Sequence, residues 1–251
     1  MTVQDINVEP NVEPNVEWVG ETSLMLTLGH EIIVTLAPVI GRISRRIQSE
    51  CSGIREVTPS YTTILIEADT TCLDIDQLGD KILKIARDER DSSRDSDSDD
   101  EVGRSGKFIE LPVYYHSEVG PDLKAVAEYG QMTTDQVVAI HSGKEYTVCS
   151  IGFAPGFAFL ADVDERIATP RHERPRSKVV RGSVGIAGRQ TAVYPADTPG
   201  GWQIIGNCPL PLFDPEGNAP FKVGVSIFEV GDRVRFIPID RETFLQQGGN
   251  V

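Results

Sequence analysis

Cysteine and histidine are scarce in this sequence, with four of each among 251 residues. No C-x-x-C or H-E-x-x-H motif occurs, and no two histidines have the spacing of a zinc-binding pair. The cysteines lie far apart in apolar or mixed surroundings, which is typical of reduced, buried thiols. We therefore expect no disulfide framework and no protein-bound metal. The cysteines are Cys51, Cys72, Cys149 and Cys208.

Long apolar segments are missing as well. No run approaches the ~18 apolar residues that a membrane-spanning helix requires. Residues 1–18 are acidic and polar, without the basic start and the apolar core of a secretory signal. These absences favour a cytoplasmic location.

Positive charge is in deficit. The formal net charge is −14, so the chain would repel the backbone of a nucleic acid. Neither a P-loop, G-x-x-x-x-G-K-[ST], nor a G-x-S-x-G nucleophile motif is present, and the glycines at 182, 185 and 188 do not have the dinucleotide-binding spacing. If the chain binds ATP, it does so without a P-loop.

The first half of the chain is organised in three segments. Residues 1–19 contain an imperfect Asn-Val-Glu-Pro repeat without an apolar face, which predicts a disordered or extended tail. Residues 20–87 alternate between strand and helix patterns, with strands near 24–28 and 61–66, and apolar helical spacing near 36–47 and 75–85. This alternation predicts a small α/β domain of ferredoxin-like character. Residues 88–106 are dense in acids and serine and predict a solvated linker.

Residues 107–251 form the second domain. A strand is expected at 108–115, followed by a helix that Gly120-Pro121 opens and a second helix that Thr133 caps together with Gln136. From Tyr146 onward, short strands alternate with turns rich in glycine and proline, and 230–233 predicts a hairpin between 223–228 and 234–237. The pattern indicates a mainly β, barrel-like domain.

Two loops of this domain are candidates for a binding site. One contains Gly152, Pro155 and Gly156, and the other contains Gly201 and Trp202. Glycine allows close backbone approach and proline stiffens the chain, so such loops can present N–H groups to an anion or a carbonyl oxygen. Turns at the corners of a barrel explain the same composition.

Basic residues gather in one short stretch of this acidic chain. Arginine suits a carboxylate or a phosphate because its planar guanidinium binds both oxygens at once. The alternative is that each of these cations pairs with a surface acid. The stretch contains Arg171, Arg174, Arg176, Lys178, Arg181 and Arg189.

His141 is a candidate proton shuttle because the pKa of free histidine lies near neutrality. It lies at the end of the helix that Thr133 caps. A histidine at this position is also explained by its favourable interaction with the helix dipole.

Several motifs of the chain resemble one family. They are Gly120-Pro121-Asp122-Leu123, His141-Ser142, Gly152-Phe153-Ala154-Pro155-Gly156-Phe157, 182–188, Gln190-Thr191, Tyr194-Pro195 and Pro199-Gly200-Gly201-Trp202. Together they resemble the B-subunit family of 5-oxoprolinase, which is also called the allophanate hydrolase subunit 1 or KipI-like family. The resemblance runs from about residue 20 to residue 239.

The resemblance implies a fold, a reaction and partners. The fold would be α+β, with the small ferredoxin-like domain followed by a cyclophilin-like β-barrel. The reaction would be ATP-dependent opening of 5-oxo-L-proline to L-glutamate, with ATP bound as its magnesium complex. The partners would be a C-subunit homologue in direct contact and an A-subunit homologue, and the chain alone would be inactive.

The same motifs imply roles for individual residues. His141 and Gln190 would act in catalysis. The residues expected to bind substrate or ATP are Gly152, Pro155, Gly156, Arg171, Arg176, Arg181, Tyr194, Gly201 and Trp202. Related sequences form part of a urea carboxylase carboxyltransferase, and one relative inhibits a sensor histidine kinase, so both functions are alternatives.

Overall fold

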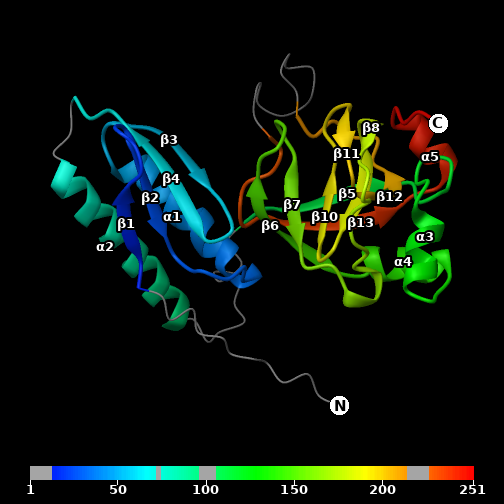
Figure 1. Cartoon of the computed structure of the whole chain (residues 1–251), viewed down its shortest axis with the longest axis horizontal. Helices are drawn as coiled ribbons and strands as arrows, with labels where there is room; N and C mark the ends of the chain where they lie inside the picture. The colour runs from blue at the N-terminus through cyan, green and yellow to red at the C-terminus, as the bar shows by residue number, and fades with distance from the viewer. Residues whose placement is uncertain (1–12, 72–74, 96–105, 214–225) are drawn as a thin grey trace. The chain divides into compact units, whose positions relative to one another are not determined.

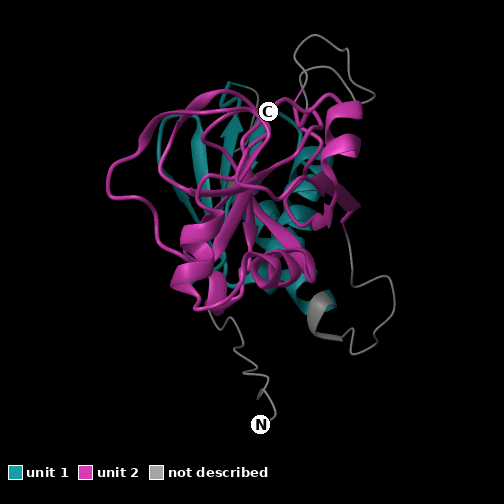
Figure 2. Cartoon of the chain, turned by 90° about the vertical axis from the view of Figure 1, so that its right-hand side faces the viewer, with its two compact units in different colours: residues 1–104 teal, residues 105–251 magenta. Residues whose placement is uncertain are grey.

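The computed structural model describes residues 13–71, 75–95, 106–213 and 226–251 (Figure 1). The chain divides into two compact units, Met1–Arg104 and Ser105–Val251, which we call unit 1 and unit 2 (Figure 2). Within the described ranges, no helix is both long enough and apolar enough to cross a membrane.

Unit 1 is built on an antiparallel sheet of four strands. The order across the sheet is β1 (Asn15–Trp18), β2 (Ser23–Thr27), β4 (Thr63–Ala68) and β3 (Ile54–Pro59). Alternate residues of β2 and β4 are buried, which places Leu24, Leu26, Ile64 and Ile66 on one apolar face.

Two helices of unit 1 bury their apolar sides. They are α1 (Ala37–Glu50), which follows the short helix η1 (Val34–Leu36), and α2 (Ile75–Asp95). The helices pack against each other and against strands of the sheet, and the apolar residues at helical spacing, such as Ile43 and Ile82, are fully buried. The two helices expected from this spacing are confirmed.

Two expectations for unit 1 are not confirmed: the N-terminal tail and the ferredoxin-like order of the elements. Asn15–Trp18 pairs with β2 in antiparallel register, so the prediction of a tail is wrong for these residues. β3 was not expected because charges interrupt its apolar residues. The chain runs through two strands, a helix, two strands and a helix, and the ferredoxin-like order is not confirmed. Residues 1–12 lie outside the described ones.

The acidic segment also differs from the expected linker. Helix α2 continues to Asp95, so the first part of residues 88–106 is helical, and 96–105 lie outside the described residues. Glu89 explains why the helix continues, since its carboxylate accepts hydrogen bonds from Arg42 at 2.7 Å and Arg46 at 3.2 Å on α1. This acid binds a neighbouring helix where the sequence suggested only solvation.

Unit 2 contains a seven-stranded sheet that nearly closes into a barrel. Its order is β12 (Gln203–Asn207), β9 (Ser183–Ala187), β10 (Gln190–Val193), β7 (Ala158–Ala161), β6 (Glu145–Ile151), β13 (Arg233–Pro238) and β5 (Phe108–Val113). The pair β13–β5 is parallel and the others are antiparallel. The two end strands meet where Tyr114 and Asn207 exchange backbone hydrogen bonds of 2.9 and 3.0 Å. The barrel-like sheet expected from the sequence is confirmed.

Short helices and a two-stranded ribbon complete unit 2. The helices are α3 (Leu123–Tyr129), α4 (Thr134–Ser142), η2 (Glu165–Ile167) and α5 (Arg241–Gln246), and the ribbon joins β8 (Arg176–Val179) to β11 (Thr198–Gly200). Thr133 and Gln136 form the expected capping box, with hydrogen bonds of 2.9 and 3.2 Å.

The hairpin expected around residues 230–233 does not form in the described part of the chain. Strand β13 pairs with β5 and β6. The residues just before it, 226–232, form one isolated bridge, between Phe213 and Ser226. Asp232 instead fixes the turn, because its carboxylate accepts the backbone N–H groups of Lys107 at 2.8 Å and Glu229 at 2.7 Å. Residues 223–225 lie outside the described ones.

Candidate functional site

The loop that joins β6 to β7 presents aromatic rings in two directions. Gly156 has a φ of +81°, and a Cβ there would lie 2.7 Å from the Cβ of Phe213, so the turn requires glycine. Phe153 is 66% exposed, whereas Phe157 is buried. The N–H of Gly152 donates to the oxygen of Phe157 at 3.1 Å and is therefore already used within the loop.

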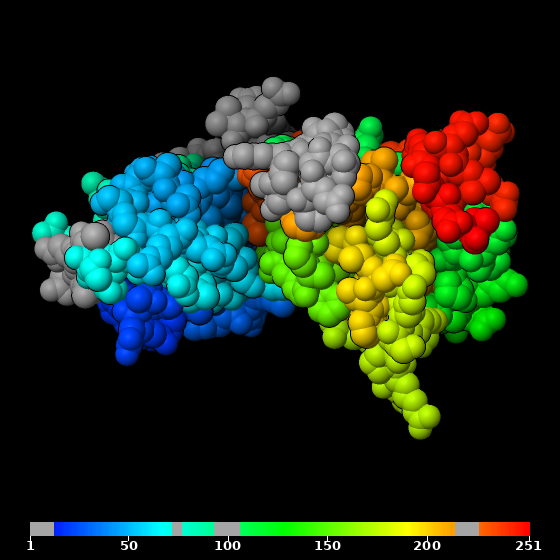
Figure 3. Space-filling model, turned by 90° about the horizontal axis from the view of Figure 1, so that it is seen from above, coloured from blue at the N-terminus to red at the C-terminus, as the bar shows by residue number. Residues whose placement is uncertain are grey.

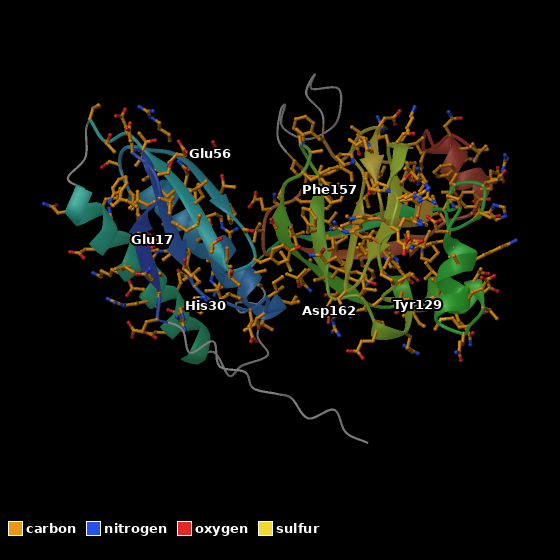
Figure 4. All side chains as sticks on the ribbon, in the orientation of Figure 1. Glu17, His30, Glu56, Tyr129, Phe157 and Asp162 are labelled. Carbon is orange, nitrogen blue, oxygen red and sulfur yellow. The ribbon has the colours of Figure 1, made fainter. Side chains whose placement is uncertain are left out.

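Aromatic rings from β7 and from several loops of unit 2 form a cleft next to this loop. Its volume is about 330 Å³. We call it the aromatic cleft, and its ring-bearing residues are Phe153, Phe157, Phe159, His172, Tyr194 and Trp202. The ring of Phe157, labelled in Figure 4, meets those of Tyr194 and Trp202 edge-on at 5.2 and 5.5 Å.

The predicted residues Arg171, Tyr194, Gly201 and Trp202 come together in this cleft. The Arg171 guanidinium lies 5.7 Å from the centre of a Trp202 ring, in the geometry of a cation–π contact. Tyr194 packs its hydroxyl directly over Gly200, where a Cβ would collide with it. Burial raises the pKa of Tyr194, so its hydroxyl stays protonated at neutral pH.

Asp122 anchors the segment that carries Arg171. Its carboxylate accepts a hydrogen bond of 2.6 Å from Arg176 and another of 2.6 Å from the backbone N–H of Ile204. The Nε2 atom of His172 lies 3.3 Å from the same carboxylate. Arg176, predicted to bind an anionic ligand, therefore already has an acidic partner in the protein.

Arg181 faces a different and larger cleft. That cleft has a volume of about 780 Å³, and Arg176, Lys178 and Asp197 also line it. Lys178 pairs with Asp197 at 2.7 Å, and its hydrogen bond is the main reason why the pKa of that carboxyl is lowered. The structure thus divides the predicted arginines between two clefts of unit 2.

His141 lies in the interior of unit 2 and lines neither cleft. Its side chain is fully buried, stacks on Phe236 at 4.5 Å, and has Nδ1 at 2.7 Å from the Tyr115 hydroxyl and Nε2 at 2.9 Å from the Thr191 hydroxyl. Burial lowers its pKa to about 3, so the ring is neutral at neutral pH. The two hydroxyls connect α4 to the barrel through this ring.

Gln190 also lies away from both clefts. It is the first residue of β10 and pairs with Ala187 and Ala161. Its neighbour Arg189 forms ion pairs with Asp162, labelled in Figure 4, and with Glu165. Surface acids therefore hold two cations of the basic stretch, Arg189 and Lys178, in agreement with the alternative interpretation of the sequence.

Sequence reasoning missed two kinds of residue at the aromatic cleft. Phe159 and His172 line the cleft but lie in no motif that suggests binding. Asp122 was missed because its partner Arg176 is 54 residues away along the chain, and such a distant pair leaves no local pattern in the sequence. The proline at 121 and the glycine at 120 marked Asp122 as part of a helix start. Nothing in that pattern indicated that its carboxylate faces β12 and the ribbon.

Within the described ranges, no group of three histidine, cysteine, aspartate or glutamate side chains is placed to hold a metal ion. The three described cysteines, Cys51, Cys149 and Cys208, are buried free thiols. Burial raises the pKa of Cys149 and of Cys208 to about 12, so these thiols are poor nucleophiles. Cys72 lies outside the described residues.

Comparison with known proteins defines the class of this barrel-containing chain. The family model described as carboxyltransferase domain, subdomain C and D, matches residues 14–223. The urea carboxylase of Kluyveromyces lactis has a similar fold, with a TM-score of 0.67 and 17% identity, over 94% of this chain and 23% of that one. The chain belongs to the carboxyltransferase subdomain C and D family.

Two curated relatives are similar along nearly their whole length. The B subunit of 5-oxoprolinase from Bacillus subtilis (strain 168) is 36% identical over 91% of this chain and 94% of that protein. The protein of the same name from Escherichia coli O157:H7 is 37% identical over 88% of this chain and 94% of that protein. The family resemblance drawn from the sequence motifs is confirmed.

Proposed function

We propose that this chain is the B subunit of an ATP-dependent 5-oxoprolinase, which opens 5-oxo-L-proline to L-glutamate. The observation that carries the proposal is the similarity, over nearly the full length, to two proteins named as B subunits of 5-oxoprolinase. Because these relatives are named as subunits, their name supports the proposal that this chain is also part of a larger assembly. In this proposal a C-subunit homologue binds the chain directly, an A-subunit homologue completes the enzyme, and the chain alone has little activity.

The proposed chemistry activates a lactam. Resonance stabilises the amide, so the carbonyl oxygen first attacks the γ-phosphorus of ATP, bound as its magnesium complex, and ADP leaves. Water then attacks the activated carbon, the ring C–N bond breaks, and the nitrogen takes up a proton. A second water releases phosphate from the resulting acyl phosphate and gives glutamate. The catalytic demand is positioning and stabilisation of spreading negative charge.

The residues of unit 2 divide this work between the two clefts. Arg171 offers a cation to a substrate group in the aromatic cleft, and Arg181 offers one in the larger cleft. Arg176 contributes by fixing the chain between them, because Asp122 holds its guanidinium. The clefts therefore suit two different anionic groups.

His141 and Gln190 keep their proposed roles as proton shuttle and as hydrogen-bond donor to the lactam oxygen. Neither residue lines the aromatic cleft or the larger cleft. His141 is fully buried, so its role requires that assembly with the other subunits exposes it, whereas Gln190 is already partly exposed. The replacement His141→Ala or Gln190→Ala, made in the reconstituted enzyme, tests each role. Unchanged turnover removes the residue from the scheme.

Glutamate release tests the function as a whole. The chain is mixed with homologues of the A and C subunits, ATP and 5-oxo-L-proline, and each protein is left out in turn. We expect turnover only in the complete mixture. Absence of turnover in a mixture that has been shown to assemble would overturn the proposal.

A second candidate function is a part in a urea or allophanate carboxyltransferase. The family name and the fold shared with a urea carboxylase favour it. This function requires a partner that carries biotin, whereas the oxoprolinase requires none. Carboxyl transfer from a biotin carrier to urea, in a mixture inactive on 5-oxo-L-proline, would establish the second candidate in place of the first.

A further inference from the structure

We propose that the aromatic cleft binds a small molecule that combines a flat, uncharged ring with one carboxylate, and that Arg171 receives the carboxylate. This inference rests on the proposed function, because 5-oxo-L-proline is such a molecule. It assigns one particular substrate group to one residue. It also separates the aromatic cleft from the larger cleft of unit 2.

The walls of the cleft suit a small flat ring. A volume of about 330 Å³ is at the lower end of the range for small-molecule sites. The Phe157 ring meets the rings of Tyr194 and Trp202 edge-on, so this wall of the cleft is built mainly of packed aromatic rings. At the rim, Phe153 meets Phe157 at 5.2 Å and is 66% exposed. A polyphosphate is poorly matched to such a wall, whereas an uncharged ring loses little hydration there.

Arg171 has the charge that a carboxylate needs. Within the described ranges it makes a ring contact with Trp202 and has no acidic partner, whereas Arg176 is paired with Asp122. In a chain of net charge −14, an arginine without an acid is left available for a ligand. Its guanidinium can donate two parallel hydrogen bonds to a carboxylate, and the cation–π contact with Trp202 places it at the cleft.

The segment from Arg171 to Arg176 is held in place before a ligand arrives. The N–H of His172 donates to the oxygen of Gly201 at 2.7 Å, and Arg176 donates to Asp122 at 2.6 Å. This part of the chain, coloured yellow-green in Figure 3, projects from the surface of unit 2. Because His172 is bonded to Gly201 beside β12 and Arg176 to Asp122 at the start of α3, we expect binding to cost little further ordering of this segment.

Binding to the full chain tests the proposal. Ligand-observed NMR detects millimolar affinities and compares 5-oxo-L-proline with 2-pyrrolidone, which has the same ring and no carboxylate. We expect the Arg171→Gln substitution to weaken the binding of 5-oxo-L-proline about tenfold or more, since it removes a charge-assisted hydrogen-bonded pair. The affinity for 2-pyrrolidone should be weak and should not respond to this substitution.

Arg174→Gln is the matched control. Arg174 is exposed, belongs to the same segment and lines neither cleft, so its replacement removes the same charge outside the site. The affinity of the Arg174→Gln variant for 5-oxo-L-proline should stay within about twofold of the affinity of the unaltered chain. Equal affinities for the Arg171 and Arg174 variants would overturn the proposal. So would absence of binding to both the chain and its assembled complex.

Turnover separates this inference from the proposed function. If the assembled enzyme releases glutamate and Arg171→Gln changes neither kcat nor KM, the function stands and the assignment of Arg171 falls. If the chain binds 5-oxo-L-proline through Arg171 and the assembled mixture has no turnover, the assignment stands and the function falls.

Discussion

Single side chains of unit 2 connect elements that are distant in the sequence, and Asp122 is one of them. It lies at the start of α3, yet its carboxylate bonds Arg176 on β8 and the backbone of Ile204 on β12. Only 6% of Asp122 is exposed; its bond to the N–H of Ile204 is buried, and its bond to Arg176 is partly buried. Loss of the negative charge would leave the guanidinium without its partner.

We therefore predict that Asp122→Asn lowers the free energy of unfolding by about 1–3 kcal/mol, the cost of losing a charge-assisted bond in a buried position. Urea unfolding followed by fluorescence measures the change. Glu173→Gln is the control, because this substitution at an exposed acid removes the same charge from the segment beside Arg176. Equal stabilities of the two variants would show that the Asp122 network contributes little.

His141 makes the stability of the protein depend on pH. Its pKa is about 3 in the folded protein because the ring is buried, against an ordinary value of 6.5. Between these two values the unfolded chain takes up a proton that the folded chain does not, so stability falls as the pH falls through this window. One such group contributes a slope of up to about 1.4 kcal/mol per pH unit.

We predict that the stability of the His141→Gln variant depends less steeply on pH. The free energy of unfolding of this variant should change less between pH 6.5 and pH 3 than that of the unaltered chain. Equilibrium unfolding in urea at several pH values gives both curves. His116→Gln, which changes a histidine with an exposed side chain, is the matched control. A His141→Gln curve parallel to that of the unaltered chain would contradict burial of a neutral ring.

At the scale of elements, the loop between β6 and β7 depends on one glycine more than on another. Gly156 has a φ of +81° and lies against Phe213, whereas a Cβ at Gly152 meets nothing within 4 Å. We predict that Gly156→Ala costs about 1–3 kcal/mol of stability, from strain and overpacking. Gly152→Ala should stay within about 0.5 kcal/mol of the unaltered chain. Thermal unfolding of the two variants compares them, and similar melting temperatures would contradict the loop geometry.

The elements that could be predicted from the sequence are those that local patterns determine. The apolar spacing of α1 and the capping box at Thr133 each lie within a few residues, and both are present. β1 and β3 could not be predicted in this way. Their residues become a strand only through pairing with β2 and β4, which supply the backbone partners.

The same distinction applies to the candidate site. Arg171, Tyr194 and Trp202 could be named because they lie in or beside recognisable motifs, and the fold brings them into one cleft. Which arginines are left for a ligand could not be named, because this depends on acids far away along the chain. Asp122 lies 54 residues before Arg176. Such pairs are determined by the packing of the barrel.

At the scale of the whole molecule, excess negative charge opposes the compact state. Raising the salt concentration from about 0.01 M to 0.15 M shortens the Debye length from about 30 Å to about 8 Å and screens this repulsion. Surface ion pairs, such as Arg233 with Glu145, are weakened as well, but each contributes only about 0–1 kcal/mol. With a net charge of −14, we expect the melting temperature to rise over this range.

Thermal unfolding at a series of sodium chloride and potassium chloride concentrations measures this effect. The two salts should act alike, because screening depends on ionic strength. A melting temperature that falls with added salt would mean that attraction within ion pairs outweighs the overall repulsion.

The closure of the barrel in unit 2 has a consequence for its motions. The two end strands are joined by an isolated bridge, the two hydrogen bonds between Tyr114 and Asn207, whereas β5 and β13 share a continuous ladder of six residue pairs. A junction of two bonds opens at a lower free energy than a longer ladder. We therefore expect the junction between β5 and β12 to open before the pairing of β5 with β13 does, and the amide protons at that junction to exchange with solvent first.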